Sequence, residues 1–219
     1  MKYKTCVAIA EKNPKKLAII VKNTLKKSDF VEIRFDFLKP KEVPDALELV
    51  KKQLNRCVCT LRPKSEGGKF MGSENERKSI IKLIAGYNPF LLDVEFNALQ
   101  KDKQFLNSMK NSRVKILVSW HDFKKTPSLI NLNKKLRDMK KLSEYVKIVT
   151  MAKTVNEAVK ILSLYNNSSK TKLIAFAMGE EAKFTRILCL HMGSPFTYVS
   201  LRKAIAPGQF SLEEIRSMN

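Results

Sequence analysis

Lys147 stands in a short and almost wholly apolar stretch, residues 144–151, where a lysine is unusual. A lysine is seldom fully buried unless it is paired or put to use. Burial disfavours the charged form, so a buried lysine can hold a free amine near neutral pH. Such an amine can attack a ketone or aldehyde and form a Schiff base. The alternative is a lysine at a strand end that reaches solvent, the common placement for this residue type.

His121 is one of two histidines and follows the apolar stretch 114–120, where it would share a face with Ser119. An imidazole at the end of a strand, beside a strand that carries a lysine, is a candidate general acid and base. Taken alone, an isolated histidine is more often structural. His191 ends a helix-like segment rather than a strand, so we interpret it as structural or exposed.

Two loops carry further polar groups. Glu66 precedes Gly67 and Gly68 after a strand candidate, and a carboxylate there could hydrogen-bond an imidazole and fix its tautomer. The alternative is a solvated loop glutamate, and the glycine pair does not fit a phosphate-binding loop. Gln209 ends the turn-like segment 206–209, which is either a plain connection or a mobile lid over a polar ligand.

Short apolar strands alternate with lysine-rich amphipathic segments along the chain, which is the pattern of βα units and a parallel sheet. The strand candidates are 5–10, 31–37, 56–62, 90–96, 114–120, 145–151, 172–178 and 196–200. The helix candidates are 14–27, 41–54, 74–86, 98–110, 128–142, 155–166, 181–190 and 211–217. Eight such units in 219 residues predict an α/β fold, a small (β/α)8 TIM barrel. No linker or charge block divides the chain, so we predict a single domain over residues 1–219.

Polar side chains alternate with apolar ones in several of these strands. The polar faces hold Glu32, Arg34 and Asp36 in one strand, Asp93 and Glu95 in another, and Arg62 at the end of a third. A single strand of this kind is typical of a half-exposed sheet edge. Several of them in a parallel pattern favour polar faces that converge inside the barrel and at its carboxyl-end mouth, where active sites of this fold lie.

The chain is strongly basic, with 42 Lys plus Arg against 21 Asp plus Glu and a formal net charge of +21. The lysines are scattered as pairs along most segments, and no RNA-binding signature accompanies them. We therefore interpret the charge as a solubilising surface and expect no nucleic-acid partner. A nucleic-acid-binding protein stays an alternative, and its affinity would fall steeply with salt.

No apolar run reaches the length of a membrane span, and the N-terminus leads directly into a strand-like segment. We expect no signal peptide, no membrane partner and a cytoplasmic location. The cysteines show no zinc-ligand spacing, so we expect reduced, buried thiols and no metal site. They are Cys6, Cys57, Cys59 and Cys189.

Taken in chain order, the polar residues resemble those of the type I 3-dehydroquinate dehydratases. The resemblance lies in Glu32-Ile-Arg34-Phe-Asp36, Arg62 with Glu66-Gly-Gly68, Asp93-Val-Glu95, Ser119-Trp-His121-Asp-Phe123, Lys147-Ile-Val-Thr-Met151, Met178-Gly179, Arg186 and Ala206-Pro-Gly-Gln209. No single motif decides the matter, but the ordered set is specific and runs from the second strand to the last loop.

The resemblance implies a (β/α)8 barrel, usually a homodimer, that converts 3-dehydroquinate to 3-dehydroshikimate in the shikimate pathway without cofactor or metal. It implies that Lys147 forms an imine with the substrate ketone and that His121 is the general acid and base, with Glu66 as its orienting partner. The implied ligands of the substrate hydroxyls and ring are Glu32, Arg34 and Arg62. Those implied to hold the carboxylate and close the lid are Arg186 and Gln209.

The chain departs from these relatives at a few positions. Ile205 stands where many relatives carry serine, so any substrate contact of that hydroxyl must be supplied otherwise. Lys183 and Thr185 stand near Arg186 where relatives often have Gly and Ser. Another Schiff-base barrel, such as a class I aldolase, is a second hypothesis for Lys147, although no phosphate-binding glycine-rich turn follows the last strands.

Overall fold

Contacts within the chain divide it into two compact units. The computed structural model describes residues 3–201 and 206–218. The N-terminal unit is Val7–Ile116, and the C-terminal unit is Leu117–Asn219 together with Met1–Cys6. The single domain that the sequence favours stays a prediction.

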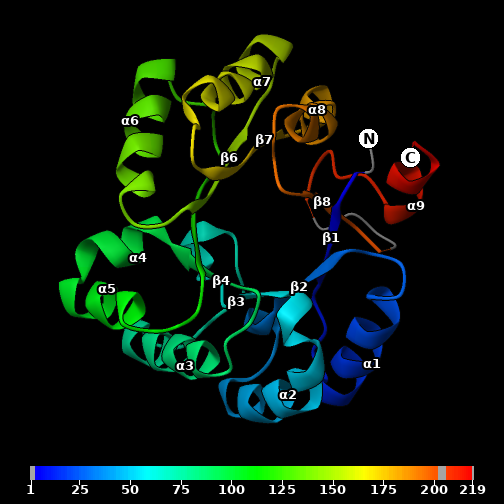
Figure 1. Ribbon diagram of the computed structural model, residues 1–219, viewed down its shortest axis with the longest axis vertical. Helices are drawn as coiled ribbons and strands as arrows, with labels where there is room; N and C mark the ends of the chain where they lie inside the picture. The colour runs from blue at the N-terminus through cyan, green and yellow to red at the C-terminus, as the bar shows by residue number, and fades with distance from the viewer. Residues whose placement is uncertain (1–2, 202–205, 219) are drawn as a thin grey trace. The chain divides into compact units, whose positions relative to one another are not determined.

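Eight strands alternate with helices along the described residues, as the sequence predicted (Figure 1). The strands are β1 (Thr5–Ile9), β2 (Phe30–Arg34), β3 (Cys57–Thr60), β4 (Leu91–Glu95), β5 (Ile116–Asp122), β6 (Tyr145–Met151), β7 (Lys172–Met178) and β8 (Thr197–Val199). Each lies at a predicted strand, and β6 and β7 match it at both ends.

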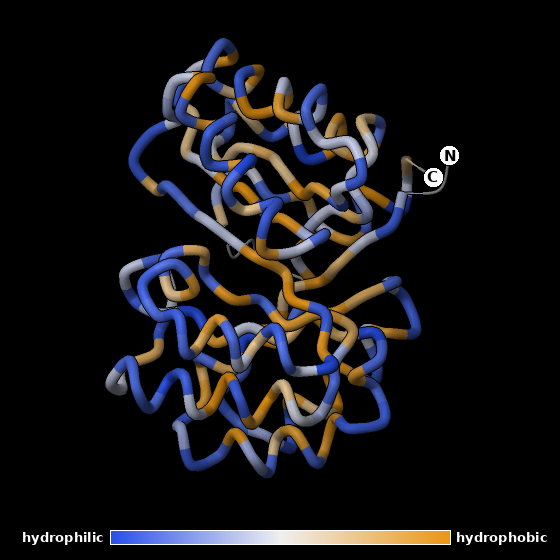
Figure 2. Tube along the Cα trace, turned by 60° about the vertical axis from the view of Figure 1, so that its left-hand side comes forward, coloured by the Kyte–Doolittle hydropathy of each residue, from blue (hydrophilic) through white to orange (hydrophobic). Residues whose placement is uncertain are grey.

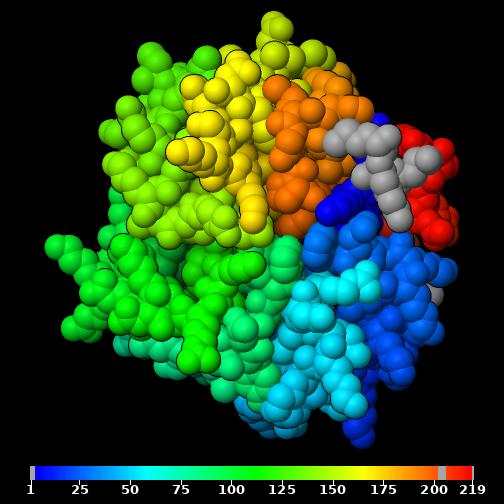
Figure 3. Space-filling model, in the orientation of Figure 1, coloured from blue at the N-terminus to red at the C-terminus, as the bar shows by residue number. Residues whose placement is uncertain are grey.

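In the N-terminal unit, β2, β3 and β4 pair in parallel, with Val31 opposite Cys57 and Val58 opposite Leu91. The α-helices are α1 (Pro14–Thr24), α2 (Val43–Val50), α3 (Glu74–Gly86), α4 (Phe96–Lys101) and α5 (Lys103–Lys110). The 3-10 helices are η1 (Phe35–Phe37), η2 (Pro40–Glu42), η3 (Lys51–Arg56) and η4 (Lys64–Glu66). Helices α1 and α2 pack side by side, and their atoms form a continuous surface in Figure 3.

In the C-terminal unit, β5, β6 and β7 pair in parallel, with Leu117 opposite Tyr145 and Tyr145 opposite Lys172. The α-helices are α6 (Leu129–Lys140), α7 (Val155–Leu162), α8 (Thr185–His191) and α9 (Leu212–Ser217). The 3-10 helices are η5 (Ser163–Asn167) and η6 (Glu180–Ala182). Helices α7 and α8 pack against β7 and against each other.

Short polar side chains begin many of the helices. The side chains of Asn13, Ser73 and Ser128 accept hydrogen bonds from backbone N–H groups in the first turns of α1, α3 and α6. Such caps stabilise a helix by about 1 kcal/mol, because they pair N–H groups that the helix itself leaves unpaired. Figure 2 shows orange, hydrophobic stretches within each unit, and most strand residues are buried.

Several predicted boundaries were wrong, among them that of β5, which extends beyond the predicted residue 120 to Asp122 and so includes His121. The strand predicted at 31–37 ends at Arg34, and the 3-10 helix η1 follows it. The helix predicted at 98–110 is two helices, because Asp102 takes an extended backbone conformation and its side chain caps α5. The early end of β2 matters for its polar residues, because the 3-10 turn brings Asp36 back toward Arg34.

No helix among the described residues is long and apolar enough to cross a membrane. All four cysteines are buried, as expected from their apolar surroundings. Burial raises the pKa of the Cys57 thiol to about 12 and that of Cys189 to about 11. Both therefore favour the neutral thiol over the reactive thiolate.

Candidate active site

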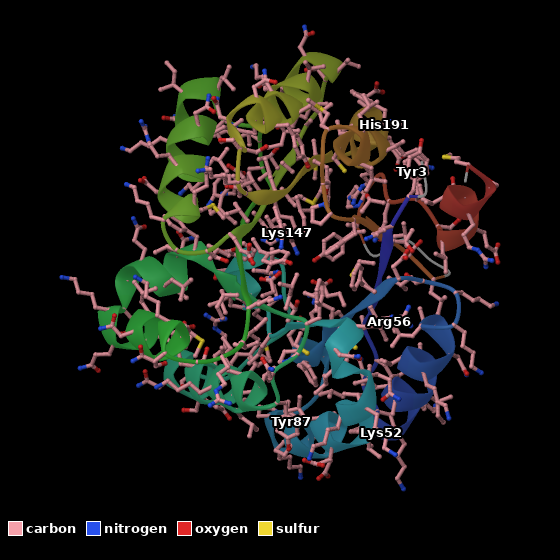
Figure 4. The ribbon with its side chains drawn as sticks, viewed as in Figure 1. Tyr3, Lys52, Arg56, Tyr87, Lys147 and His191 are labelled. Atoms are coloured by element: carbon pink, nitrogen blue, oxygen red, sulfur yellow. The ribbon has the colours of Figure 1, made fainter. Side chains whose placement is uncertain are left out.

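Lys147 is buried in the middle of β6, where its side chain is 4% exposed (Figure 4). Its neighbours Val146 and Ile148 are fully buried, so the strand itself holds the lysine in an apolar setting. The Nζ atom lies 4.4 Å from the centroid of the Tyr198 ring on β8. This placement excludes the alternative of a strand-end lysine in solvent.

His121 lies near the end of β5, on the face that carries Lys147 on β6. Ser119 is paired with Lys147, and His121 is paired with Val149. Paired residues of neighbouring strands point to the same face, and alternate residues of one strand do so as well. The imidazole and the amine therefore project to one side of the sheet on adjacent strands.

Arg186 of α8 is buried, and its guanidinium lies over the Phe176 ring with 4.3 Å from Cζ to the ring centroid. Its Nη2 donates to the Pro207 carbonyl at 3.3 Å, and its Nε has no hydrogen-bond partner among the described residues. Burial lowers the pKa of Arg186 to about 10, against smaller raising effects from Cys189 and Glu180. A cation in this state binds an anionic oxygen well, since a bidentate carboxylate would satisfy its N–H groups.

The described part of the last loop lies against the turn that follows β7. The Gly208 amide donates to Glu180 at 3.1 Å, and the Ala206 amide donates to Gln209 Oε1 at 3.4 Å. Gly208 has φ +66 and passes so close to Gly179 that a Cβ atom would collide with its backbone. Gln209 is buried, whereas Ile205 lies outside the described residues.

The N-terminal unit holds a second polar cluster, centred on Arg62 just after β3. Arg62 donates from Nη2 to Asp93 at 2.6 Å and from Nη1 to Glu95 at 2.9 Å. Burial by itself lowers the pKa of Arg62, but the charges of Asp93 and Glu95 outweigh it and raise the pKa above its ordinary value. The guanidinium is therefore a fixed positive charge.

Arg77 of α3 extends this network. Its Nη1 donates to Glu95 at 2.5 Å, and its Nε and Nη2 donate to the two oxygens of Glu74 at 2.9 Å and 2.8 Å. Glu95 thus receives one arginine on each of its oxygens. Sequence reasoning missed Arg77, because helical periodicity alone does not distinguish a buried arginine from an exposed one.

The polar residues of β2 are also partnered within this unit. Glu32 accepts a hydrogen bond from the Thr60 hydroxyl at 2.9 Å, and both are buried. Arg34 donates to the two oxygens of Asp36 at 2.8 Å each, and Asp36 also accepts from the Lys69 amide. Arg34 is thus held in one orientation by a bidentate carboxylate.

Glu66 is buried at the end of η4 and accepts a hydrogen bond from the Asn97 amide at 3.3 Å. Burial, together with the nearby charge of Glu95, raises the pKa of Glu66 to about 7. Glu66, Glu95 and Asn97 line a cavity of about 590 Å³ in this unit. A carboxyl group with this pKa can exchange a proton near neutral pH.

A family model for type I 3-dehydroquinase matches residues 5–218. The chain belongs to the type I 3-dehydroquinase family. The 3-dehydroquinate dehydratase of Methanococcus maripaludis is 34% identical to it over 219 residues, with 97% of each chain covered. That of Pyrococcus abyssi is 37% identical over 190 residues, which cover 86% of this chain and 85% of the relative.

Among solved structures, the type I 3-dehydroquinate dehydratase of Clostridium difficile with covalently modified comenic acid superposes with a TM-score of 0.87 and 26% identity. The superposition covers 99% of this chain and 90% of that one. The predicted fold class of this type I 3-dehydroquinase is thereby confirmed, an α/β fold of the (β/α)8 TIM barrel kind.

Within the C-terminal unit of this type I 3-dehydroquinase, Lys147 and His121 share one sheet face, and Arg186 and Gln209 are buried. Within the N-terminal unit, the predicted site residues are buried or half-buried, and each is hydrogen-bonded to a carboxylate, a hydroxyl or an amide. They are Glu32, Arg34, Arg62 and Glu66. Sequence reasoning missed the rings of Phe176 and Tyr198, because an aromatic residue in a strand is usually part of the core.

Proposed function

We propose that this chain is a 3-dehydroquinate dehydratase, a hydro-lyase of the shikimate pathway that converts 3-dehydroquinate to 3-dehydroshikimate and water. The proposal is supported by membership of the type I 3-dehydroquinase family. The observation that carries its mechanism is the buried amine of Lys147 on the same sheet face as the imidazole of His121.

In the first proposed step, the lone pair of Lys147 Nζ forms a bond to the ketone carbon of the substrate. The carbonyl π electrons move to the oxygen, which takes up a proton, and the resulting carbinolamine loses one water. The product is a protonated imine that carries its positive charge on Nζ. The imine withdraws electrons from the neighbouring carbon, so a proton on that carbon becomes acidic.

In the second step, His121 takes that proton, and the C–H electron pair neutralises the imine to an enamine. The enamine then expels the β-hydroxyl group, which leaves as water with a proton from the same imidazole. One further water hydrolyses the new imine and frees the amine, so the net change is the loss of one water. A positioned acid and base of this kind contributes about 10²- to 10⁴-fold to a rate.

Arg186 and Gln209 are proposed to hold the substrate carboxylate. Arg186 is suited to this because its buried Nε has no hydrogen-bond partner among the described residues. Arginine also presents its N–H groups in a planar fork that matches two carboxylate oxygens. The formal net charge of +21 would further attract an anionic substrate, although steering depends on the local field.

We also propose roles for the polar residues of the N-terminal unit. Glu32, Arg34 and Arg62 are proposed ligands of the substrate hydroxyls and ring, and Glu66 is proposed to set the protonation and orientation of the acid/base group. Their support is the family resemblance, together with burial that holds each in one orientation. The proposal includes a cytoplasmic homodimer that acts without cofactor or metal.

The test is to mix the purified protein with 3-dehydroquinate and follow the ultraviolet absorbance of the conjugated enone product. Borohydride added during turnover should reduce the imine and leave a mass adduct on Lys147, located by peptide mass spectrometry. No enone would overturn the proposed function. Turnover with an adduct on another residue would overturn only the proposed mechanism. Cleavage of a carbon–carbon bond in a phosphorylated sugar would favour the aldolase hypothesis instead.

A further inference from the structure

Two buried nitrogen-bearing side chains of the C-terminal unit lie over two aromatic rings. Arg186 Cζ is 4.3 Å from the centroid of the Phe176 ring, and Lys147 Nζ is 4.4 Å from that of the Tyr198 ring. All four side chains are buried, each at most 5% exposed. Cation–π attraction is strongest in such a setting, because water does not compete for the charge.

The two rings contact each other. The centroids of Phe176 and Tyr198 are 6.3 Å apart with an angle of 54° between the planes, and Phe196 packs edge-on against Tyr198 at 5.6 Å. Tilted pairs at such distances are favourable arrangements of aromatic rings. Phe176 belongs to β7 and Tyr198 to β8, so the ring that Arg186 contacts is fixed by strand positions rather than by a loop.

Arg186 has few other restraints among the described residues. Its Nη2 donates to the Pro207 carbonyl at 3.3 Å, and its Nε has no hydrogen-bond partner in the described part of the chain. A ring below the guanidinium attracts its charge without occupying its N–H groups. Contact with Phe176 can therefore hold the cation while the edge of the guanidinium stays available to an anion.

We propose that Phe176 is a positioning residue for the substrate carboxylate, because its ring holds the Arg186 guanidinium in the orientation that binds the carboxylate. Tyr198 packs against the Phe176 ring and also contacts Lys147 Nζ, so the two rings connect Arg186 to the proposed Schiff-base lysine. The inference rests on the proposed function, since it assigns Arg186 to the carboxylate of the substrate.

The test replaces Phe176 with phenylalanines that carry one, two or three ring fluorines. Fluorine withdraws electrons from the ring face and weakens its attraction for a cation, while the ring keeps nearly the same shape. We expect KM for 3-dehydroquinate to rise with each fluorine while kcat changes little. Phe176→Leu should raise KM by about 2- to 30-fold, the range for loss of one cation–π contact. Phe176→Tyr keeps an aromatic ring at this position and should keep KM close to the wild-type value.

A matched control is the same fluorine series at Phe105 of α5, a buried ring 5.7 Å from Lys78 Nζ. Fluorination of Phe105 should leave KM unchanged, because the contact between Phe105 and Lys78 lies outside the proposed substrate site. A substrate analogue with a carboxamide in place of the carboxylate should bind weakly and show no dependence on fluorination at Phe176. Thermal melting of each variant checks that the fold is retained.

If the unmodified protein does not turn over 3-dehydroquinate, the proposed function fails. If it turns over the substrate and Arg186→Leu raises KM, but the fluorine series at Phe176 leaves KM flat, only the present inference fails. An equal effect of fluorination on binding of the carboxamide analogue would also overturn the inference. The Phe176 ring would then influence binding through packing and not through the orientation of Arg186 toward a carboxylate.

Discussion

Lys147 on β6 pairs with Ser119 on β5, and His121 lies two residues after Ser119 on the same face of the sheet. This register places an imidazole diagonally across from an amine on adjacent parallel strands. A shift of the register by one residue would move His121 to the other face of the sheet. The proposed chemistry therefore depends on how β5 and β6 pair.

Replacing Lys147 with alanine should abolish turnover, because no other group would supply the electron sink of the imine. Enone absorbance should stay at the background rate, and borohydride should leave no adduct. Lys172→Ala is the matched control, since Lys172 lies on the next strand with its side chain about half exposed and bonded to the Tyr145 hydroxyl. That variant should keep its activity, and a substrate adduct in Lys147→Ala would contradict the assignment.

Replacing His121 with alanine should slow turnover by about 10²- to 10⁴-fold, the usual contribution of a positioned acid and base. The adduct on Lys147 should still form after borohydride, because imine formation and proton abstraction are separate steps. The control is His191→Ala, which removes a hydrogen bond of 2.8 Å to the Tyr3 hydroxyl. If His121→Ala keeps most of the rate, the imidazole is not the acid and base.

The raised pKa of Glu66 predicts a pH-dependent stability. Its pKa is about 7 in the folded protein against an ordinary value of 4.5. Between these values the folded state holds a proton that the unfolded chain has lost, so stability falls as pH rises through this window. Glu66→Gln should remove that loss, and its free energy of unfolding relative to the wild type should rise by up to about 3 kcal/mol across the window.

The measurement is urea unfolding of both proteins at pH 4.5, 5.5, 6.5 and 7.5, about the range over which the shift acts. A constant difference between the two proteins would show that the Glu66 carboxyl titrates alike in the folded and unfolded states. A difference that falls as pH rises would mean that its ionised form is stabilised in the fold, contrary to the prediction.

Replacing Arg77 with methionine should destabilise the protein by about 3–5 kcal/mol, since it removes one of the two arginines on the buried Glu95 carboxylate. Glu74→Gln is the matched control, because it alters the half-exposed partner of the same arginine. It should cost only about 1 kcal/mol or less. Urea unfolding compares the two, and equal losses would mean that burial of the network is unimportant.

Local patterns were enough to predict the strands and helices. Short apolar runs between lysine-rich amphipathic segments located all eight strands among the described residues. The strand at 31–37 was predicted too long, because the period of the side chains does not reveal that Asp36 turns back to bind Arg34. Periodicity predicts which faces of a helix or strand are apolar, but it does not predict which group a polar side chain will hydrogen-bond.

By itself, the sequence determined the alternation of βα units, the presence of one lysine inside an apolar strand, and a histidine close to the end of the preceding strand. These features are local, since they depend on residues a few positions apart. The tertiary structure alone decided that His121 and Lys147 share a face, that Arg186 lies over Phe176, and that Glu95 joins Arg62 to Arg77. Those contacts join residues distant in the chain, and packing between elements sets them.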